Sequence, residues 1–219
     1  AIACSWDTEL VGEMAGGIAR EAKDLSVSVI LGPGVNMKRS PLCGRNFEYY
    51  SEDPYLAGKL AANYIKAMQA EGVGTSVKHF ACNSQETNRM TSDSMVDERA
   101  LHEIYLRAFE IAVKEGNPAT IMGSYNLIGG VSACENKYLL TEILRNKWGF
   151  DGLVMSDWGA CVDLPACIEA GMDIEMPDSN GVHYDSVKTA LSDNTLSGQA
   201  LDRAVNNVKK LCDSYRRTD

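Results

Sequence analysis

The sequence predicts an α/β fold and, within that class, a (β/α)8 TIM-like barrel that is incomplete at the N-terminus. Segments with strand patterns and segments with helix patterns alternate along the chain, and alternating βα units produce a parallel sheet with helices outside it. Polar or unusual residues follow every predicted strand. An open doubly wound sheet gathers such residues at one crevice, whereas a barrel places them at the ends of several strands. Their spread therefore favours a barrel.

Five short apolar segments are predicted to be strands: residues 27–31, 76–80, 120–125, 152–157 and 172–176. Such near-continuous apolar character is expected of parallel strands that are buried on both faces. Helical spacing of apolar residues is found at 7–23, 56–68, 101–112, 137–148, 165–170 and 199–215. Asp7 is predicted to cap the first helix and Gly116 the end of the third. Because five strands cannot close an eight-stranded barrel, we expect at least one βα unit upstream of Ala1.

The composition is that of a globular domain and argues against two classes of partner. The chain has 219 residues, 45% of them hydrophobic, and a formal net charge of −9. This charge argues against a nucleic acid, which needs clustered Lys and Arg, and against an anionic membrane surface. No apolar stretch approaches the ~20 residues of a transmembrane helix. No linker or repeat divides the chain, so residues 1–219 are expected to form one domain.

Seven cysteines are scattered along the chain without CxxC spacing. Their odd number and their spacing support neither a disulfide framework nor a zinc site, so free buried thiols are expected. A reducing compartment fits this state, which predicts a cytoplasmic protein. The chain begins Ala-Ile-Ala-Cys, with no Met and no signal peptide, which indicates a fragment or a processed product.

Asp157 is the most informative single residue. It ends the apolar run 152–157 and is followed at once by Trp158. Asp is depleted in strands, and an ionised carboxylate in a core is costly unless it is paired. A carboxylate delivered to the rim of a sheet beside an aromatic ring suits a nucleophile that works on the apolar ring face of a sugar. The alternative is that Asp157 only caps the next helix.

Lys78 and His79 interrupt another predicted strand. Successive strand residues face opposite sides, so a bulge or the strand end must direct both side chains to the rim. There they would offer hydrogen-bond donors to sugar hydroxyls or to a carboxylate. The alternative is a satisfied core histidine beside a lysine whose charged end reaches solvent.

Other polar residues carry weaker signals when each is taken alone. Three of them are ordinary loop or rim residues by this criterion: Arg45, Arg89 and Tyr125. Three others are possible second carboxylates: Glu86, Glu135 and Glu175. The last of these stands at a predicted strand end and is the best placed. His102 is expected to be solvated on a helix, and His183 to lie in a polar loop.

Together these fragments resemble glycoside hydrolase family 3, and in particular its β-glucosidase branch. The matching motifs, in chain order, are Gly44-Arg45-Asn46-Phe47-Glu48, Tyr50-Ser51-Glu52-Asp53-Pro54, Lys78-His79-Phe80, Ser124-Tyr125-Asn126 and Ser156-Asp157-Trp158-Gly159-Ala160. The resemblance covers nearly the whole chain and implies a barrel-like catalytic domain that performs a retaining double displacement on β-linked glucosides. It implies that Asp157 is the nucleophile and that Trp158 packs beside the bound sugar. The residues implied to hold the sugar hydroxyls and to orient the nucleophile are Arg45, Lys78, His79, Arg89 and Tyr125.

The resemblance also implies that two parts of the enzyme lie outside this chain. The family's Asp-Gly-Pro segment, whose Asp grips the sugar's outer hydroxyls, would precede Ala1. The acid/base of the β-glucosidase branch is a Glu on a C-terminal α/β sandwich domain, so that domain and a β-glucoside or oligosaccharide are the expected partners. Retention needs two carboxyl groups ~5–5.5 Å apart, and the sequence supplies only Asp157 with a clear signal. No metal and no cofactor is implied.

Several alternatives remain open from the sequence. The same machinery could act on β-xylosides or α-arabinosides, or the chain could be a catalytically silent carbohydrate-binding or structural fragment. The stretch after Phe80 lacks the Pro-Gly-His/Asp-Gly loop of the family's N-acetylglucosaminidase branch, which is therefore not expected. Lys78 is expected beside Asp157, where its positive charge would favour the ionised carboxylate. Unpaired edges of a partial barrel could lead to a homo-oligomer.

Overall fold

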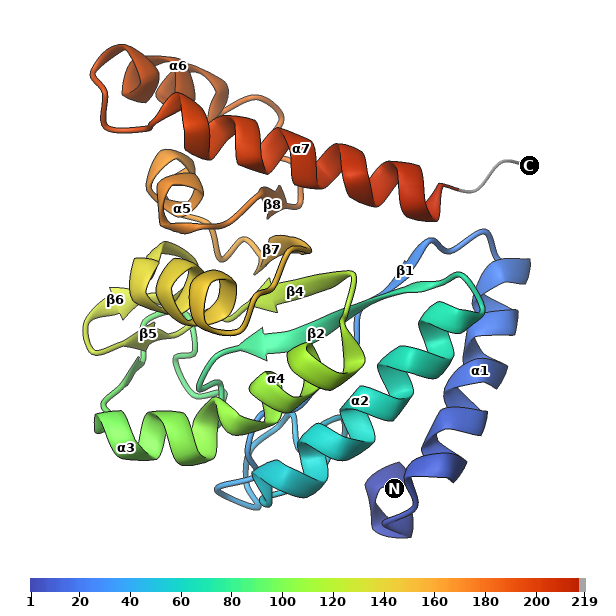
Figure 1. Cartoon of the computed structure of the whole chain (residues 1–219). Coiled ribbons are helices and arrows are strands. Elements are labelled where there is room, and N and C mark those ends of the chain that lie inside the picture. Colours follow the sequence, from blue (N-terminus) through green and yellow to red (C-terminus); the bar gives the residue numbers. More distant parts are fainter. Residues whose placement is uncertain (217–219) are drawn as a thin grey trace.

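Five parallel strands form the main sheet of the computed structural model, which describes residues 1–216 (Figure 1). The strands are β1 (Val29–Ile30), β2 (Gly74–Phe80), β4 (Thr120–Gly123), β7 (Leu153–Trp158) and β8 (Ile174–Met176). Their spatial order, β1-β2-β4-β7-β8, is also their order along the chain, and every neighbouring pair is parallel. A doubly wound sheet would reverse its strand order at a switch point. The observed order is the one expected around a barrel wall.

Helices alternate with these strands, as the sequence predicts. They are α1 (Thr8–Asp24), α2 (Pro54–Ala70), α3 (Glu98–Ala100), η2 (Leu101–Tyr105), α4 (Arg107–Ile111), η3 (Ala112–Gly116), η5 (Tyr138–Lys147), α5 (Leu164–Ala170), α6 (Tyr184–Ser192) and α7 (Gly198–Tyr215), with short 3-10 turns η1 (Ile2–Ser5) and η4 (Ala133–Glu135). Asp7 caps α1 as predicted, because its carboxylate accepts hydrogen bonds from the backbone N–H groups of Glu9 and Leu10 at 2.9 and 3.0 Å. Figure 1 shows α1, α2 and α4 together on one side of the sheet.

Several predicted boundaries need correction. Gly116 is not the helix cap: Asn117 takes the left-handed conformation, with φ 52°, and its N–H bonds the carbonyl of Val113. Gly116 is needed for close packing instead, since a Cβ there would lie 3.1 Å from the Cα of Ala62 in α2. Tyr125 lies two residues beyond the end of β4 rather than within it. A small second sheet was not predicted; it comprises β3 (Asp93–Ser94), β5 (Leu127–Ile128) and β6 (Val131–Ser132).

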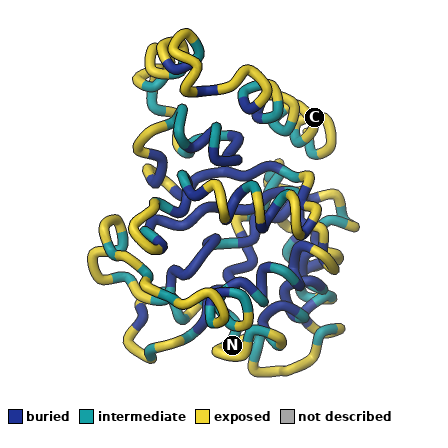
Figure 2. The backbone as a smooth tube through the Cα atoms, turned by 60° about the vertical axis from the view of Figure 1, so that its left-hand side comes forward, coloured by how far each residue is buried: buried dark blue, intermediate teal, exposed yellow. Residues whose placement is uncertain are grey.

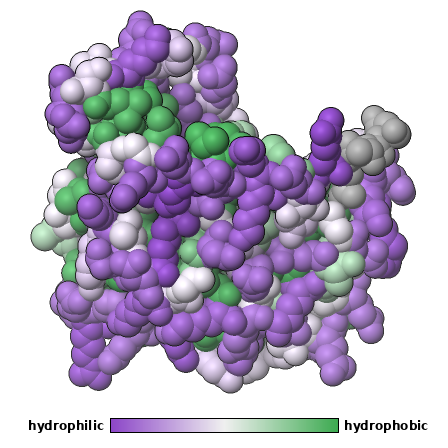
Figure 3. All heavy atoms as spheres, turned by 45° about the horizontal axis from the view of Figure 1, so that its top comes forward, coloured by the Kyte–Doolittle hydropathy of each residue, from purple (hydrophilic) through white to green (hydrophobic). Residues whose placement is uncertain are grey.

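The sheet is apolar on both faces, and Figure 2 shows its strands as the buried centre of the molecule. Alternate residues of β2, β4 and β7, such as Val77, Ile121 and Val154, join the main core beneath the helices. The opposite face carries a smaller cluster of Met122, Leu153 and Met155, against which Val208 and Leu211 of α7 pack. On the face seen in Figure 3, hydrophilic side chains predominate, and apolar ones gather where the C-terminal helices approach the body. Among residues 1–216, no helix combines the length and apolar character that a membrane span requires.

Candidate active site

Polar side chains from four strands or the loops after them lie at the carboxyl edge of the sheet. This edge is where parallel strands of a barrel present functional residues. β2 loses its regular register with β4 between Val77 and Phe80, which confirms the irregularity predicted for Lys78 and His79. The Asn36 side chain replaces the missing ladder contacts, since it accepts from the His79 N–H at 2.7 Å and donates to the His79 carbonyl at 2.9 Å.

Two contacts of the His79 ring determine which nitrogen carries the proton. Arg45 Nη2 lies 2.8 Å from His79 Nε2, and because a guanidinium can only donate, Nε2 must accept. The ring proton is therefore on Nδ1, which lies 3.0 Å from the Tyr49 hydroxyl and donates to it. Burial, and then the positive charges of Arg45, Lys78 and Arg89, lower the pKa of His79 to about 2. The ring is therefore neutral at physiological pH.

Glu48 connects two of the predicted cations. Its carboxylate accepts a short hydrogen bond from Arg45 Nε and forms an ion pair with Lys78 Nζ at 2.9 Å. Burial alone would raise the pKa of Glu48, but the hydrogen bonds from Lys78 and Arg45 outweigh it, so the pKa is lowered. The direct ion pair of Lys78 within residues 1–216 is therefore with Glu48 and not with Asp157, so any influence of Lys78 on Asp157 acts without a direct pair.

A second carboxylate, Glu86, organises the other side of the site. It pairs with Arg89 Nη1 at 2.8 Å and accepts from Asn83 Nδ2 at 3.0 Å. The same Asn83 amide donates to the Tyr49 hydroxyl at 2.8 Å, which links this group to the hydrogen bond of His79. The Arg89 guanidinium lies 4.3 Å from the centre of the Tyr125 ring. Two loops are thereby joined into one network.

Asp157 stands at the end of β7 with its two carboxylate oxygens in different situations. Oδ1 accepts from the backbone N–H of Trp158 at 2.7 Å. Oδ2 is buried and receives no hydrogen bond from any described residue. Its neighbour at 3.4 Å is His79 Nε2, which is itself an acceptor in the tautomer that Arg45 imposes. One oxygen is therefore fixed, and the other keeps its lone pairs available.

Two aromatic residues complete the surroundings of Asp157. The Tyr125 hydroxyl donates to the Trp158 carbonyl at 2.9 Å. Burial, then the negative charge of Asp157 and then a side-chain hydrogen-bond contact with it raise the pKa of Tyr125, so this hydroxyl also lies within reach of the carboxylate. Trp158 itself is 43% exposed, so an apolar ring face is open to a ligand beside the carboxylate.

The charges in this cluster are balanced, but they are paired unevenly. Its six charged groups are three cations and three anions: Arg45, Lys78, Arg89, Glu48, Glu86 and Asp157. Glu48 and Glu86 hold all three cations in ion pairs. Within the described chain, Asp157 has no Lys or Arg partner. The arrangement leaves one buried carboxylate oxygen free for chemistry.

The structure brings together the seven residues singled out from the sequence: Arg45, Lys78, His79, Arg89, Tyr125, Asp157 and Trp158. The helix-cap alternative for Asp157 is wrong, because Asp163 caps α5. Glu175 is engaged elsewhere, with His183 Nδ1 2.6 Å from its Oε2. Sequence reasoning missed the supporting roles of Asn36, Glu48, Tyr49 and Asn83. Of these, only Glu48 had a signal, since it ends the Gly44–Glu48 motif.

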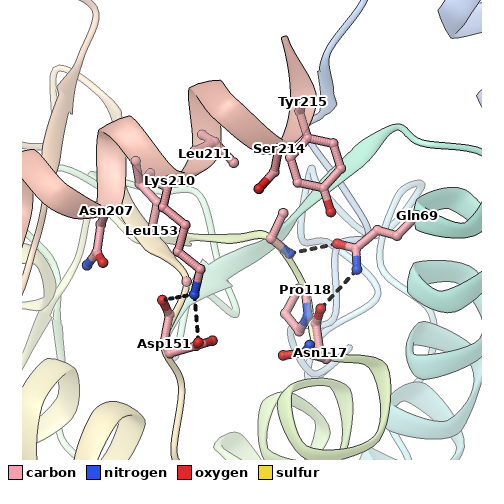
Figure 4. Close-up of a pocket in the computed structure, with 12 residues that line it drawn as sticks. Gln69, Asn117, Pro118, Asp151, Leu153, Asn207, Lys210, Leu211, Ser214 and Tyr215 are labelled. Carbon is pink, nitrogen blue, oxygen red and sulfur yellow. Dashed lines mark hydrogen bonds and ion pairs between the residues drawn. The ribbon is translucent and has the colours of Figure 1, made fainter.

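A separate cavity of about 160 Å³ lies at the opposite edge of the sheet, between α7 and the residues that precede β4 and β7 (Figure 4). The Gln69 amide bonds the Asn117 carbonyl and the Ala119 N–H there, and Lys210 pairs with Asp151 at 2.6 Å. These polar groups satisfy one another, whereas the buried Asn207 Nδ2 in the same lining has no hydrogen-bond partner among the described residues. In barrels this edge contributes stability rather than catalysis. The cavity is therefore a gap between packed elements and is not assigned to the candidate active site.

Comparisons with known proteins agree with this geometry. The model of the glycosyl hydrolase family 3 N terminal domain matches residues 1–211. The chain is 51% identical, over 96% of its length, to thermostable beta-glucosidase B of Acetivibrio thermocellus. It is 48% identical, over 98% of its length, to exo-alpha-(1->6)-L-arabinopyranosidase of Bifidobacterium longum. It spans 28% of the length of each of these two relatives.

Solved structures show the same fold. A GH3 beta-glucosidase of Bifidobacterium adolescentis superposes with a TM-score of 0.95 at 47% identity, covering 98% of this chain and 32% of that one. Beta-glucosidase 3B of Thermotoga neapolitana in complex with glucose gives 0.92 at 44% identity, covering 96% and 30%. The described residues therefore have an α/β fold whose parallel sheet curls as a half-barrel.

Proposed function

Because the chain belongs to glycosyl hydrolase family 3, we propose that it carries the nucleophile of a retaining glycoside hydrolase that releases terminal, non-reducing β-D-glucose from short β-glucosides. The observation that carries this proposal is the buried, unpartnered Oδ2 of Asp157. A buried ionised oxygen without a partner is costly. A nucleophile needs an available lone pair at a fixed position, and Asp157 meets this need because the Trp158 N–H holds its other oxygen.

The reaction proceeds in two displacements. Asp157 Oδ2 attacks the anomeric carbon, the bond from that carbon to the leaving oxygen breaks, and an acid protonates the leaving oxygen. The same group, now a base, removes a proton from water, which attacks the anomeric carbon and releases Asp157 with net retention. We place the acid/base, a Glu, on a C-terminal α/β domain of the whole enzyme. The eight-stranded closure of the barrel, of which the five described strands are part, belongs to the same proposal.

The charged cluster is suited to hold a sugar in the required position. Arg45, Lys78 and Arg89 belong to the same cluster and keep N–H donors beyond those that Glu48 and Glu86 engage, and charge-assisted hydrogen bonds are the stronger ones. Trp158 offers the apolar surface on which a sugar ring can stack. His79 positions Arg45, because its Nε2 accepts from that guanidinium, and its Nδ1 donates to the Tyr49 hydroxyl. The whole protein is proposed to be cytoplasmic, which the free cysteines of residues 1–216 support.

A labelling experiment tests the nucleophile. An activated aryl 2-deoxy-2-fluoro-β-glucoside is incubated with the full-length protein, and peptide mass mapping is expected to find the sugar on Asp157. Asp157→Ala should lose nearly all turnover while it keeps the wild-type circular dichroism spectrum. The matched control is Asp163→Ala, which removes the cap of α5 and should cost about 1 kcal/mol of stability but little turnover. A label on Glu86 or Glu175 would contradict the assignment.

A second substrate class is favoured by a specific observation, the 48% identity to an arabinopyranosidase. An α-L-arabinopyranoside lacks the hydroxymethyl group of glucose and has the opposite configuration at C4, so the two substrates differ at the C4–C5 end of the ring. Comparison of kcat/KM on nitrophenyl β-glucoside, β-xyloside and α-L-arabinopyranoside with the full-length protein decides between them. If none of the three is hydrolysed but glucose protects Trp158 fluorescence from quenching, the chain is part of a silent carbohydrate-binding protein.

A further inference from the structure

We propose that Cys161, Glu175 and His183 form a binding site for a divalent transition-metal ion, for which Zn²⁺ has the right chemistry. One donor atom of each residue lies within 4.8 Å of the others, and within residues 1–216 no other such group of three is found. The three donors are a thiol sulfur, a carboxylate oxygen and an imidazole nitrogen. This mixed set is typical of zinc, which takes four ligands in a tetrahedral arrangement.

Three separate segments supply the ligands. Cys161 lies in the turn between β7 and α5, Glu175 in β8, and His183 immediately before α6. Because the three ligands come from separate segments, no short sequence motif indicates the site. The ends of the two strands are themselves joined, since the Gly159 N–H donates to the Met176 carbonyl at 2.8 Å. A bound ion would therefore tie the loop that follows β7 to the loop that follows β8.

The surroundings favour a built site over a chance surface cluster. Cys161 is buried, and the side chains of Glu175 and His183 are only 14% and 23% exposed. The Ser179 hydroxyl donates to Glu175 Oε1 at 2.8 Å, which fixes the carboxylate in the way that outer hydrogen bonds fix metal ligands. Oε2 faces His183 Nδ1 at 2.6 Å. The ion pair explains this contact, and the buried Cys161 thiol, which also lies against Cys167, is the third donor within 4.8 Å of both atoms.

Binding balances as a simple exchange of protons for the ion. Zn²⁺ forms bonds to the Cys161 sulfur, a Glu175 oxygen and a His183 nitrogen, and the thiol proton is released to solvent. The proton now shared between His183 and Glu175 moves to the other ring nitrogen or to water. Three protein ligands leave the fourth position to a water molecule. No redox partner is needed.

Co²⁺ is the probe of choice, because cobalt bound by a thiolate gives an absorption band in the near ultraviolet. The full-length protein, reduced and treated with a chelator that is then removed, is titrated with Co²⁺ and afterwards with Zn²⁺. We expect one equivalent to bind with that band, Zn²⁺ to displace it, and either ion to raise the melting temperature. Cys161→Ser should abolish the band, and both Cys161→Ser and His183→Gln should weaken binding by more than about 100-fold, since loss of an outer partner alone costs 10–100-fold.

Three further variants serve as comparisons. Ser179→Ala should weaken binding by about tenfold. Cys212→Ser and His102→Gln remove a thiol and an imidazole outside the cluster and should bind as the wild type does. Absence of a thiolate band, or wild-type affinity in His183→Gln, would overturn the three-ligand site. These readouts are independent of turnover, so they are separate from the test of the proposed hydrolase activity.

Discussion

The neutral state of His79 predicts a loss of stability in mild acid. An unfolded histidine has a pKa of about 6.5, whereas burial and three neighbouring cations hold the pKa of folded His79 near 2. Below pH 6.5 the unfolded chain therefore binds a proton that the folded chain does not. Stability falls as the pH falls through this window. The loss begins near pH 6.5 and would continue toward pH 2.

The size of the effect follows from the width of the window. Each pH unit below 6.5 costs about 1.4 kcal/mol for one proton, so the step from pH 7 to pH 5 removes about 2 kcal/mol through His79 alone. Carboxylates titrate in the same range, so the total slope is not informative. The informative quantity is the difference between the wild type and His79→Gln, whose amide oxygen can still accept from Arg45.

Urea unfolding of both proteins at pH 7, 6 and 5 provides the measurement. The free energy of unfolding of His79→Gln should change less between pH 7 and pH 5, by about 2 kcal/mol. His102→Gln is the control for the substitution itself, because it removes an imidazole that lies beside Tyr138 and outside the candidate site, and the slope of His79→Gln is compared with it. Equal slopes for wild type and His79→Gln would refute the assignment, as would a histidine NMR signal of His79 that titrates near pH 6.5.

Two matched pairs of substitutions test the packing that supports the site. Gly58→Ala should cost about 1–3 kcal/mol of stability, because a Cβ would lie 2.7 Å from the Cβ of Ile111, whereas Gly12→Ala meets nothing closer than 3.8 Å and should stabilise by up to about 1 kcal/mol. Asp173→Asn should cost about 3–5 kcal/mol, because its fully buried carboxylate pairs with two arginines. Asp151→Asn breaks only a surface pair and should cost less than about 1 kcal/mol. Chemical denaturation measures the free energy of unfolding of all four variants. Equal effects of Gly58→Ala and Gly12→Ala would contradict the packing argument, and equal effects of Asp173→Asn and Asp151→Asn would contradict the ion-pair argument.

The alternation of strands and helices could be predicted because it depends on local patterns. Each βα unit has its own apolar strand segment and its own helix with apolar residues at helical spacing. Many of the helices also have their own N-terminal capping residue, as Asp7 shows for α1. Boundaries were less accurate, because packing decides them. Glycine is the residue type expected at a helix C-terminus, yet Gly116 instead lets η3 approach α2. Only the tertiary structure reveals that contact. The two-residue strands of the small sheet leave no periodic signal.

The residues of the candidate site could be predicted to the extent that strand ends mark them. Asp157, Lys78 and His79 were visible because charged or polar residues are unusual in buried strands. The partners could not be predicted, because pairing joins residues far apart in the chain: Lys78 bonds Glu48, not Asp157, and Asn36 bonds His79. A local sequence pattern does not determine which of several carboxylates forms the ion pair with a given lysine.

The pairing of the cations with Glu48 and Glu86 explains why Asp157, unlike these two glutamates, has no Lys or Arg partner among the described residues. If Lys78 or Arg45 paired with Asp157, the carboxylate would be stabilised, and its lone pairs would be engaged by donors. Glu48 instead takes both cations, and Glu86 takes Arg89. Arg45 also donates to His79 Nε2, so the nitrogen nearest to Asp157 Oδ2 has no proton to offer. Each of these contacts keeps a hydrogen-bond donor away from Asp157 Oδ2. A buried oxygen without a partner destabilises the fold, and the proposed nucleophilic role gives a reason for it, because the oxygen would then contact the substrate.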